Sequence, residues 1–274
     1  MSFTPVLPFS GYGGWAFLKR TLPGQTATFA KGPELKRDED YFRAKIGAIT
    51  TADALVADRR LLKVALGAFG LDGDINSKAF IRKVLAEGTL TDGAFVNRLA
   101  DKAYQKLSAA FGFGDFATPR SKDSAFPDKI LTAYRARQFE AAVGQQNGDL
   151  RLGLNTEREL TALAAKTGTS EDGKWFTIMG NPPLRRVFEQ ALGLPASLAA
   201  IDLDQQLTIF KDKAQAQFGD AGVSQFSDPV KVEKLIRRFL IRSEATAFAS
   251  QVGPNAAALQ MLTQTAAFAR QRFT

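Results

Sequence analysis

A short apolar phrase occurs twice in this chain of 274 residues. Residues 61–71 read LLKVALGAFGL and residues 184–194 read LRRVFEQALGL, with Leu, Val, Ala, Gly and Leu at corresponding positions. Each copy has the apolar spacing of a helix and ends in Gly-Leu. A glycine there can adopt the left-handed conformation that ends many helices, and the next leucine can pack back on the last turn. The phrase therefore predicts the same helix end at Gly70 and Gly193, with positive φ at both.

Other features accompany the two copies in the same order along the chain. An aromatic pair precedes each copy, at residues 41–42 and 175–176, and a Phe-Gly pair follows each copy. An aromatic residue with arginine three positions later comes next. We interpret this order as an internal duplication of one helical module. The residues that we expect to have equivalent structural roles are Tyr134 with Arg137, and Phe239 with Arg242.

Nearly every segment after residue 41 has helical spacing, and no stretch alternates apolar and polar residues as a strand would. The spacing predicts one helix over residues 50–69 and another over 91–111. The fold class expected is all-α, with about ten helices in two related lobes that arise from the duplication. The predicted divisions are an N-terminal arm at 1–40, a first helical module at 41–167, a second at 168–253 and a C-terminal helix at 254–274, with residues 168–174 as a linker.

Composition excludes several kinds of chemistry. The chain has no Cys and no His, so disulfides, thiolate nucleophiles, Cys/His zinc sites and Ser/His/Asp triads are all absent. Residues 72–83 begin like a calcium loop, but Ser77 replaces the required Gly and Lys83 replaces the bidentate Glu. The glycine-rich stretches lack the Lys-Ser/Thr of a phosphate-binding loop. We therefore predict no catalytic, cofactor-binding or metal-binding residues, and a protein that is not an enzyme.

The formal net charge is +8, and one predicted helix carries a basic face formed by Lys231, Lys234, Arg238 and Arg242. Cations at this spacing could follow a phosphate backbone. A solvated helix face has the same pattern, and we favour that interpretation. Arg137 and Arg242 could also bond to helix ends or to acidic residues. The basic face is a candidate partner-binding surface, and nucleic acid is not the expected partner.

The C-terminal helix predicted from residue 254 carries an apolar seam. Leu259, Leu262, Ala266 and Ala269 fall on one face. Such a seam could pack on the protein's own core or against a partner helix. Core packing is the more common use, and Leu259 and Leu262 are kept as candidate partner-binding residues.

No apolar run approaches the roughly 18 to 20 residues that a membrane-spanning helix needs. The first 15 residues lack the basic head and long apolar stretch of a secretory signal. We therefore expect a cytoplasmic protein without a membrane span. A chain exported without a cleaved signal would have the same features.

Several longer stretches together resemble one bacterial family. They include SGYGGWAFLKRT at residues 10–21, residues 41–71, AFGFG, and RQFEAAVGQQNGDLRLGL at residues 137–154. The chain resembles the bacterial domain of unknown function 1217 family across nearly its whole length. The uncharacterised members of that family are often encoded near flagellar genes. The resemblance therefore implies a role in building or regulating the flagellum, and it brings no catalytic residues.

The leading functional hypothesis is a non-enzymatic structural or adaptor protein of the bacterial flagellar system, cytoplasmic and associated with the flagellum. Its partner would be a protein, such as a flagellar component. The alternative is a nucleic-acid-binding regulator that uses the basic helix face. The sequence indicates no oligomeric state.

Overall fold

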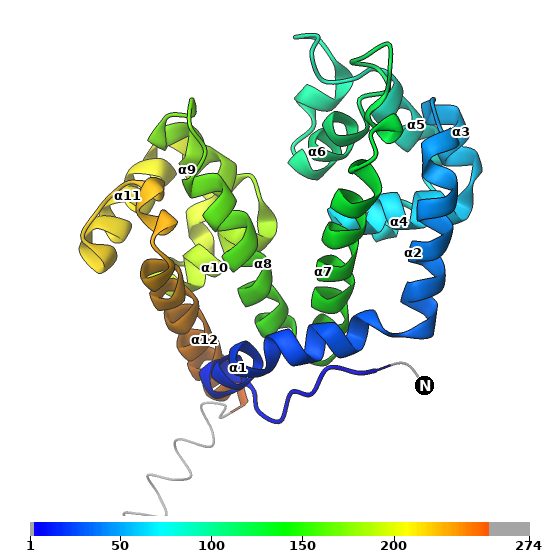
Figure 1. Cartoon of the computed structure of the whole chain (residues 1–274). Helices are drawn as coiled ribbons and strands as arrows, with labels where there is room; N and C mark the ends of the chain where they lie inside the picture. Colours follow the sequence, from blue (N-terminus) through cyan, green and yellow to red (C-terminus); the bar gives the residue numbers. More distant parts are fainter. Residues whose placement is uncertain (1–2, 252–274) are drawn as a thin grey trace, which may run out of the picture. The chain divides into compact units, whose positions relative to one another are not determined.

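The computed structural model describes residues 3–251, and all regular secondary structure in that range is helical. The prediction of an all-α fold is confirmed. None of the helices in the described range is long and apolar enough to cross a membrane. The α-helices are α1 (Gly11–Ala30), α2 (Pro33–Lys45), α3 (Ala52–Ala57), α4 (Arg59–Phe69), α5 (Lys78–Ala86), α6 (Lys102–Phe111), α7 (Phe126–Gln146), α8 (Gly148–Ala164), α9 (Glu171–Met179), α10 (Pro182–Leu192), α11 (Leu203–Phe218) and α12 (Pro229–Gln251) (Figure 1).

The chain forms two compact units. Unit 1 comprises residues up to 155 together with 176–185, and unit 2 comprises 156–175 together with the chain from 186. The boundaries of these units differ from the predicted divisions at 40 and 167, and the predicted division at 253 lies outside the described residues. The physical reason is that α8 continues through residues 155–156 without a loop, and α9 begins inside the stretch that we expected to be a linker.

In unit 1, α4 packs against both α2 and α7. The apolar face of α4 is fully buried in a core that includes Phe42, Leu62, Phe111 and Tyr134. These helices lie beside one another on the blue-to-green side of Figure 1. The predicted packing role of Tyr134 agrees with its burial at the α4–α7 contact.

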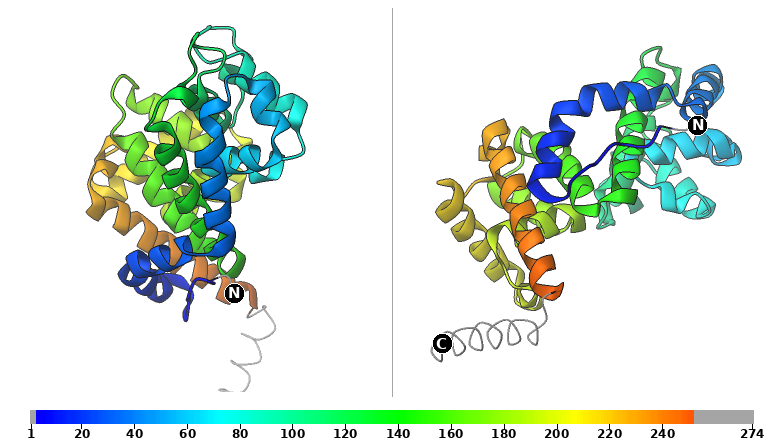
Figure 2. Two further views of the ribbon diagram at one scale, coloured as in Figure 1. Left: turned by 45° about the vertical axis from the view of Figure 1, so that its right-hand side comes forward. Right: turned by 90° about the horizontal axis from the view of Figure 1, so that it is seen from below.

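Residues 1–40 were predicted as an arm, and the structure instead packs the described part of this range into unit 1. Helix α1 contacts α7, and its Trp15 and Leu18 are fully buried. The segment before α1 runs back along that helix (Figure 2). Its backbone is fixed there because Val6 N donates to Gln25 Oε1 at 2.7 Å and the Gln25 amide donates back to the Val6 carbonyl at 3.1 Å.

Two predicted long helices are each interrupted by an aspartate. Asp58 separates α3 from α4, and its carboxylate accepts hydrogen bonds from the backbone N–H groups of Arg60 and Leu61. Asp101 is the N-cap of α6, and its carboxylate accepts a hydrogen bond from Ala103 N. The predicted helix before Asp101 is replaced by a short 3₁₀ turn, η3 (Phe95–Arg98). Apolar spacing missed both breaks because an N-cap aspartate can start a new helix without disturbing the spacing.

Unit 2 is built around a cluster of aromatic rings. Trp175 of α9 makes an edge contact with Phe188 of α10 at 5.3 Å between ring centroids and lies 5.8 Å from Phe210 of α11. Phe226, in the 3₁₀ helix η6 (Val223–Ser227), contacts both Phe188 and Phe218. Phe239 of α12 is fully buried, in agreement with its predicted structural role.

The repeated phrase ends in the same way in both units, and the predicted positive φ is confirmed. Gly70 has φ 75° and Gly193 has φ 71°. The next residue donates to the carbonyl five positions earlier, from Leu71 to Leu66 at 3.0 Å and from Leu194 to Glu189 at 2.8 Å. This pattern is the Schellman helix end that the Gly-Leu pair predicts.

Candidate functional site

The predicted basic face of α12 contacts the ends of neighbouring helices within unit 2. Lys234 Nζ donates to the Gln217 carbonyl in the last turn of α11 at 2.8 Å. Arg238 Nε donates to the Ala191 carbonyl near the end of α10 at 3.4 Å. The last carbonyls of a helix lack partners within the helix and carry partial negative charge. Both cations therefore have a structural use inside the unit.

The other two cations of this face also contact their own unit. Lys231 Nζ donates to Gln225 Oε1 at 3.1 Å. The guanidinium of Arg242 lies over Gly193, where a Cβ atom would be 2.5 Å from Arg242 Nη2. The four basic residues of α12 thus lie opposite helix ends and a loop of unit 2. The sequence alone could not predict that these groups would lie beside α12.

We expect the protein to show no salt-sensitive nucleic-acid binding, because two of these cations are hydrogen-bonded to helix ends and a third to Gln225. The parent and a K231E/K234E/R238E variant would be compared by electrophoretic mobility shift at two salt concentrations. Neither should retard DNA or RNA at micromolar protein. Submicromolar binding by the parent that weakens with salt and is lost in the variant would contradict this expectation.

Arg137 in unit 1 occupies a position comparable with Arg242 in unit 2. Its guanidinium lies 3.4 Å from the place of a Cβ on Gly70, and Nη1 donates to Asn155 Oδ1 at 3.1 Å. It also pairs with Glu140 at 3.6 Å. Of the two predicted alternatives, helix ends or acidic residues, the ion pair with Glu140 agrees with the second. Leu259 and Leu262 lie outside the described residues.

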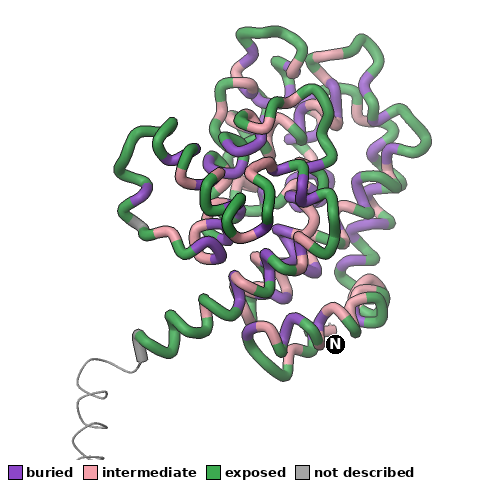
Figure 3. The backbone as a smooth tube through the Cα atoms, turned by 90° about the vertical axis from the view of Figure 1, so that its left-hand side faces the viewer, coloured by how far each residue is buried: buried purple, intermediate pink, exposed green. Residues whose placement is uncertain are grey.

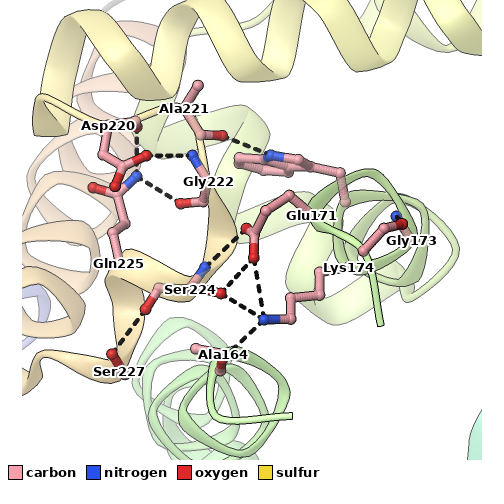
Figure 4. A network of polar contacts seen from close by, with 12 residues as sticks. Ala164, Glu171, Gly173, Lys174, Asp220, Ala221, Gly222, Ser224, Gln225 and Ser227 are labelled. Atoms are coloured by element: carbon pink, nitrogen blue, oxygen red, sulfur yellow. Dashed lines mark hydrogen bonds and ion pairs between the residues drawn. The ribbon is translucent and has the colours of Figure 1, made fainter. Parts of the chain in front are cut away.

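A second polar cluster, which the sequence did not indicate, lies in unit 2 around Lys174 (Figure 4). The Lys174 side chain is almost fully buried, and its ammonium donates to the Ala164 carbonyl at 3.1 Å, to Glu171 Oε1 at 3.2 Å and to Ser224 Oγ at 2.5 Å. The Ser224 hydroxyl donates to Glu171, and Ser224 N donates to Glu171 Oε2 at 3.1 Å. We call Glu171, Lys174 and Ser224 the α9 clamp.

The α9 clamp is electrostatically stable as an ion pair. Burial alone would raise the pKa of Glu171, but hydrogen bonds from Ser224 and Lys174 outweigh burial and lower that pKa to about 2. A serine nucleophile would need a neutral amine or another base to take its proton. Here the Ser224 hydroxyl donates to Glu171, whose lowered pKa makes it a poor base, and Lys174 Nζ lies on the oxygen of Ser224 as a donor. The arrangement therefore fits a structural clamp that ties α8, α9 and η6 together better than a Ser/Lys catalytic pair.

The α9 clamp has little local signature in the sequence. Glu171 and Lys174 stand in a Gly/Ser-rich stretch that resembles a linker, and Ser224 follows 50 residues after Lys174. The Glu-x-x-Lys spacing of a helix was a weak signal for the first pair. No local pattern connects that pair to Ser224.

Unit 1 contains a cavity of about 130 Å³ lined by both polar and apolar side chains. Lys63 bridges two carboxylates at its wall, with Nζ 2.8 Å from Asp38 and 3.0 Å from Glu34. Burial alone would lower the pKa of Lys63, and the hydrogen bonds to both carboxylates raise it above its ordinary value. The Tyr134 hydroxyl donates to Asp38 at 3.3 Å. The polar groups thus satisfy one another, and no acidic cluster that could hold a metal occurs in residues 3–251.

Comparisons with known proteins identify relatives and describe no activity. A family model described as protein of unknown function (DUF1217) matches residues 68–232. The chain is also similar to the X-ray crystal structure of a protein from Agrobacterium tumefaciens, a structural genomics target, with 27% sequence identity and a TM-score of 0.69. That similarity covers 88% of this chain and 98% of the other. No curated protein matches the chain.

Proposed function

The chain belongs to the DUF1217 family of proteins of unknown function, and from this premise we propose that it works as a non-enzymatic structural or adaptor protein. The observation that supports this proposal is the contrast between its polar groups and its exposed apolar ones. The polar clusters of both units are engaged in internal ion pairs and hydrogen bonds. Large apolar side chains meanwhile remain at the surface, among them Leu90, Val230 and Phe248, which are 69%, 74% and 68% exposed.

The place where the protein acts is proposed from the family resemblance. The family resemblance implies a gene context near flagellar genes, so we propose the flagellar apparatus as the first place to look for a protein partner. A contact function suits assembly or regulation of such an organelle, because neither requires chemistry on a small molecule. The proposed location is the cytoplasm, in association with the flagellum.

Deletion of the gene is expected to impair swimming or filament assembly while growth continues normally. Swimming in soft agar and filament counts by electron microscopy would measure this. A complementing copy that ends at Gly253 tests whether the segment from residue 254 is required for the contact. Normal swimming and normal filaments after deletion would remove the flagellar assignment.

We also propose that the two units descend from one duplicated module. Support comes from the matching helix ends at Gly70 and Gly193, each covered by an arginine from a later helix of its own unit. Arg137 follows the buried Tyr134 by three positions, and Arg242 follows the buried Phe239 by the same interval. Superposition of α4 with α7 on α10 with α12 would test the duplication.

A further inference from the structure

The buried face of α2 carries two carboxylates with different surroundings. Buried positions recur at intervals along the helices (Figure 3), and on α2 they include Asp38 and Glu39. The two oxygens of Glu39 accept hydrogen bonds from the Arg135 guanidinium, at 2.6 and 2.5 Å. The two hydrogen bonds of Asp38, from Lys63 and Tyr134, both end on one oxygen, Oδ2. Among the described residues, no donor forms a hydrogen bond with the other oxygen, Oδ1.

Asp38 lies at the wall of the cavity in unit 1 and is only 8% exposed. Its Oδ1 is 3.9 Å from Arg60 Nη2, which is beyond hydrogen-bonding distance. A buried carboxylate oxygen that lacks a donor costs free energy. The cavity volume of about 130 Å³ is several times the roughly 10–15 Å³ that one water molecule needs. The cavity therefore has room for a larger molecule that donates to Asp38.

The rest of the cavity wall combines further acceptors with apolar surface. Gln138 donates through its amide nitrogen to Asp72 at 2.8 Å, which leaves its Oε1 as an acceptor. Glu34 pairs with Lys63 through Oε1, and its Oε2 keeps its capacity to accept. The apolar side chains at the wall are Phe3, Phe29 and Leu35. The wall thus suits a molecule that has several donors at one end and an apolar stem.

The charge at this wall is negative. Glu34 and Asp38 contribute two negative charges, and Lys63 contributes one positive charge. Burial raises the pKa of Tyr134, and the negative charges of Asp38 and Asp72 raise it further, because a second anion is unfavourable there. A bound cation would balance the remaining charge, and aromatic rings such as those at this wall attract cations. An anion would be repelled.

We propose that the cavity binds a primary ammonium group carried on a short aliphatic stem. An ammonium has three N–H donors, and the acceptors that remain at the wall are Asp38 Oδ1, Glu34 Oε2 and Gln138 Oε1. The stem would pack against the apolar side chains. A free alkylamine and the lysine side chain of a partner protein share this chemistry. The binding site goes beyond the proposed function and does not depend on the flagellar assignment.

Titration of the full chain with n-butylamine hydrochloride tests the proposal. Saturation-transfer NMR should show that butylammonium binds with a dissociation constant in the millimolar range. n-Butanol, which has the same stem and no charge, should bind at least tenfold more weakly, and sodium butyrate should not bind. Equal binding of butylammonium and n-butanol would overturn the proposal. A lack of butylammonium binding at tens of millimolar would also overturn it, since the cavity would then hold only water.

Substitutions locate the site. D38N should weaken butylammonium binding at least tenfold. Because Asp38 also holds Lys63 and Tyr134, the second variant is E34Q, whose side chain is 68% exposed in the parent, so the fold should be kept. E34Q should weaken binding severalfold. The matched control is D92N, which removes the same charge from an exposed residue of unit 1 outside the cavity and should bind like the parent. Circular dichroism would check folding, and unchanged binding by a folded E34Q would overturn the proposal.

Two peptides distinguish the sources of the ammonium group. One is an N-acetylated Ala-Lys-Ala amide, and the other is the same peptide with an acetylated lysine side chain. Tighter binding of the lysine peptide than of butylammonium would assign the cavity to a lysine of a partner protein, and weaker binding would assign it to a free amine. Equal binding of the two peptides would show that the charge is not recognised, and would overturn the proposal.

Discussion

Replacement of Trp175 by alanine is expected to lower the free energy of unfolding of unit 2 by about 3–5 kcal/mol, the usual cost of removing a large buried aromatic side chain. Trp175 is fully buried against Phe188 and Phe210, and its indole N–H donates to the Ala221 carbonyl at 2.9 Å. The alanine variant would lose these ring contacts and leave the Ala221 carbonyl without the donor. W175F keeps an aromatic ring but cannot donate, so its loss should be smaller, about 1–2 kcal/mol.

The position of the two tryptophans makes this measurement selective. Trp15 lies in unit 1 and Trp175 in unit 2, and the chain has no other tryptophan. In W175A the fluorescence of Trp15 reports on unit 1 alone, while far-UV circular dichroism reports on both units. Guanidinium unfolding should show an early loss of part of the helical signal, with the Trp15 transition little changed. A loss below about 1 kcal/mol would contradict the packing described for Trp175.

The parts of the fold that could be predicted from sequence are those decided within a few residues. The Gly-Leu pairs at 70–71 and 193–194 predicted both the helix ends and the sign of φ, because only local backbone geometry is involved. An N-cap aspartate is a local signal of the same kind, and Asp202 and Asp228 accept hydrogen bonds from Asp204 N and Val230 N at the starts of α11 and α12. The helix break at Asp58 was missed because the helical spacing of apolar residues continues through this position. The sequence alone does not decide whether such an aspartate begins a new helix or lies within a longer one.

The parts that could not be predicted depend on residues far apart in the chain. The basic spacing on α12 was visible, but its meaning depended on the carbonyls at 191 and 217, which sequence does not place. Lys174 gave a still weaker signal, because its partners Ala164 and Ser224 lie on either side of it at separations of 10 and 50 residues. A lysine next to glycine and serine residues is typical of a linker, and only its burial in the fold indicates a structural role. Charge patterns therefore indicated where cations occur and not what they bind.

Replacement of Lys174 by methionine tests the α9 clamp and is expected to lower the free energy of unfolding of unit 2 by about 2–3 kcal/mol. Methionine retains a long unbranched side chain of similar size, so packing changes little. The loss arises because the buried Ala164 carbonyl is left without its donor and Glu171 loses its cation. Chemical denaturation of the full chain would measure it. An effect within about 0.5 kcal/mol of zero would mean that the buried ammonium contributes nothing net.

The matched variant is E171Q, and its effect should depend on pH. The pKa of Glu171 in the folded protein, about 2, is below its ordinary value, so the carboxylate stabilises the fold above pH 4.5. That stabilisation is lost progressively as the pH falls from 4.5 towards 2. Because the Glu171 side chain is 40% exposed, solvent screening limits its contribution to about 1 kcal/mol. E171Q should therefore be less stable than the parent near neutral pH and nearly equal to it near pH 2. If the difference persisted unchanged at low pH, the ionised carboxylate would not be the group through which Glu171 acts on Lys174 and Ser224.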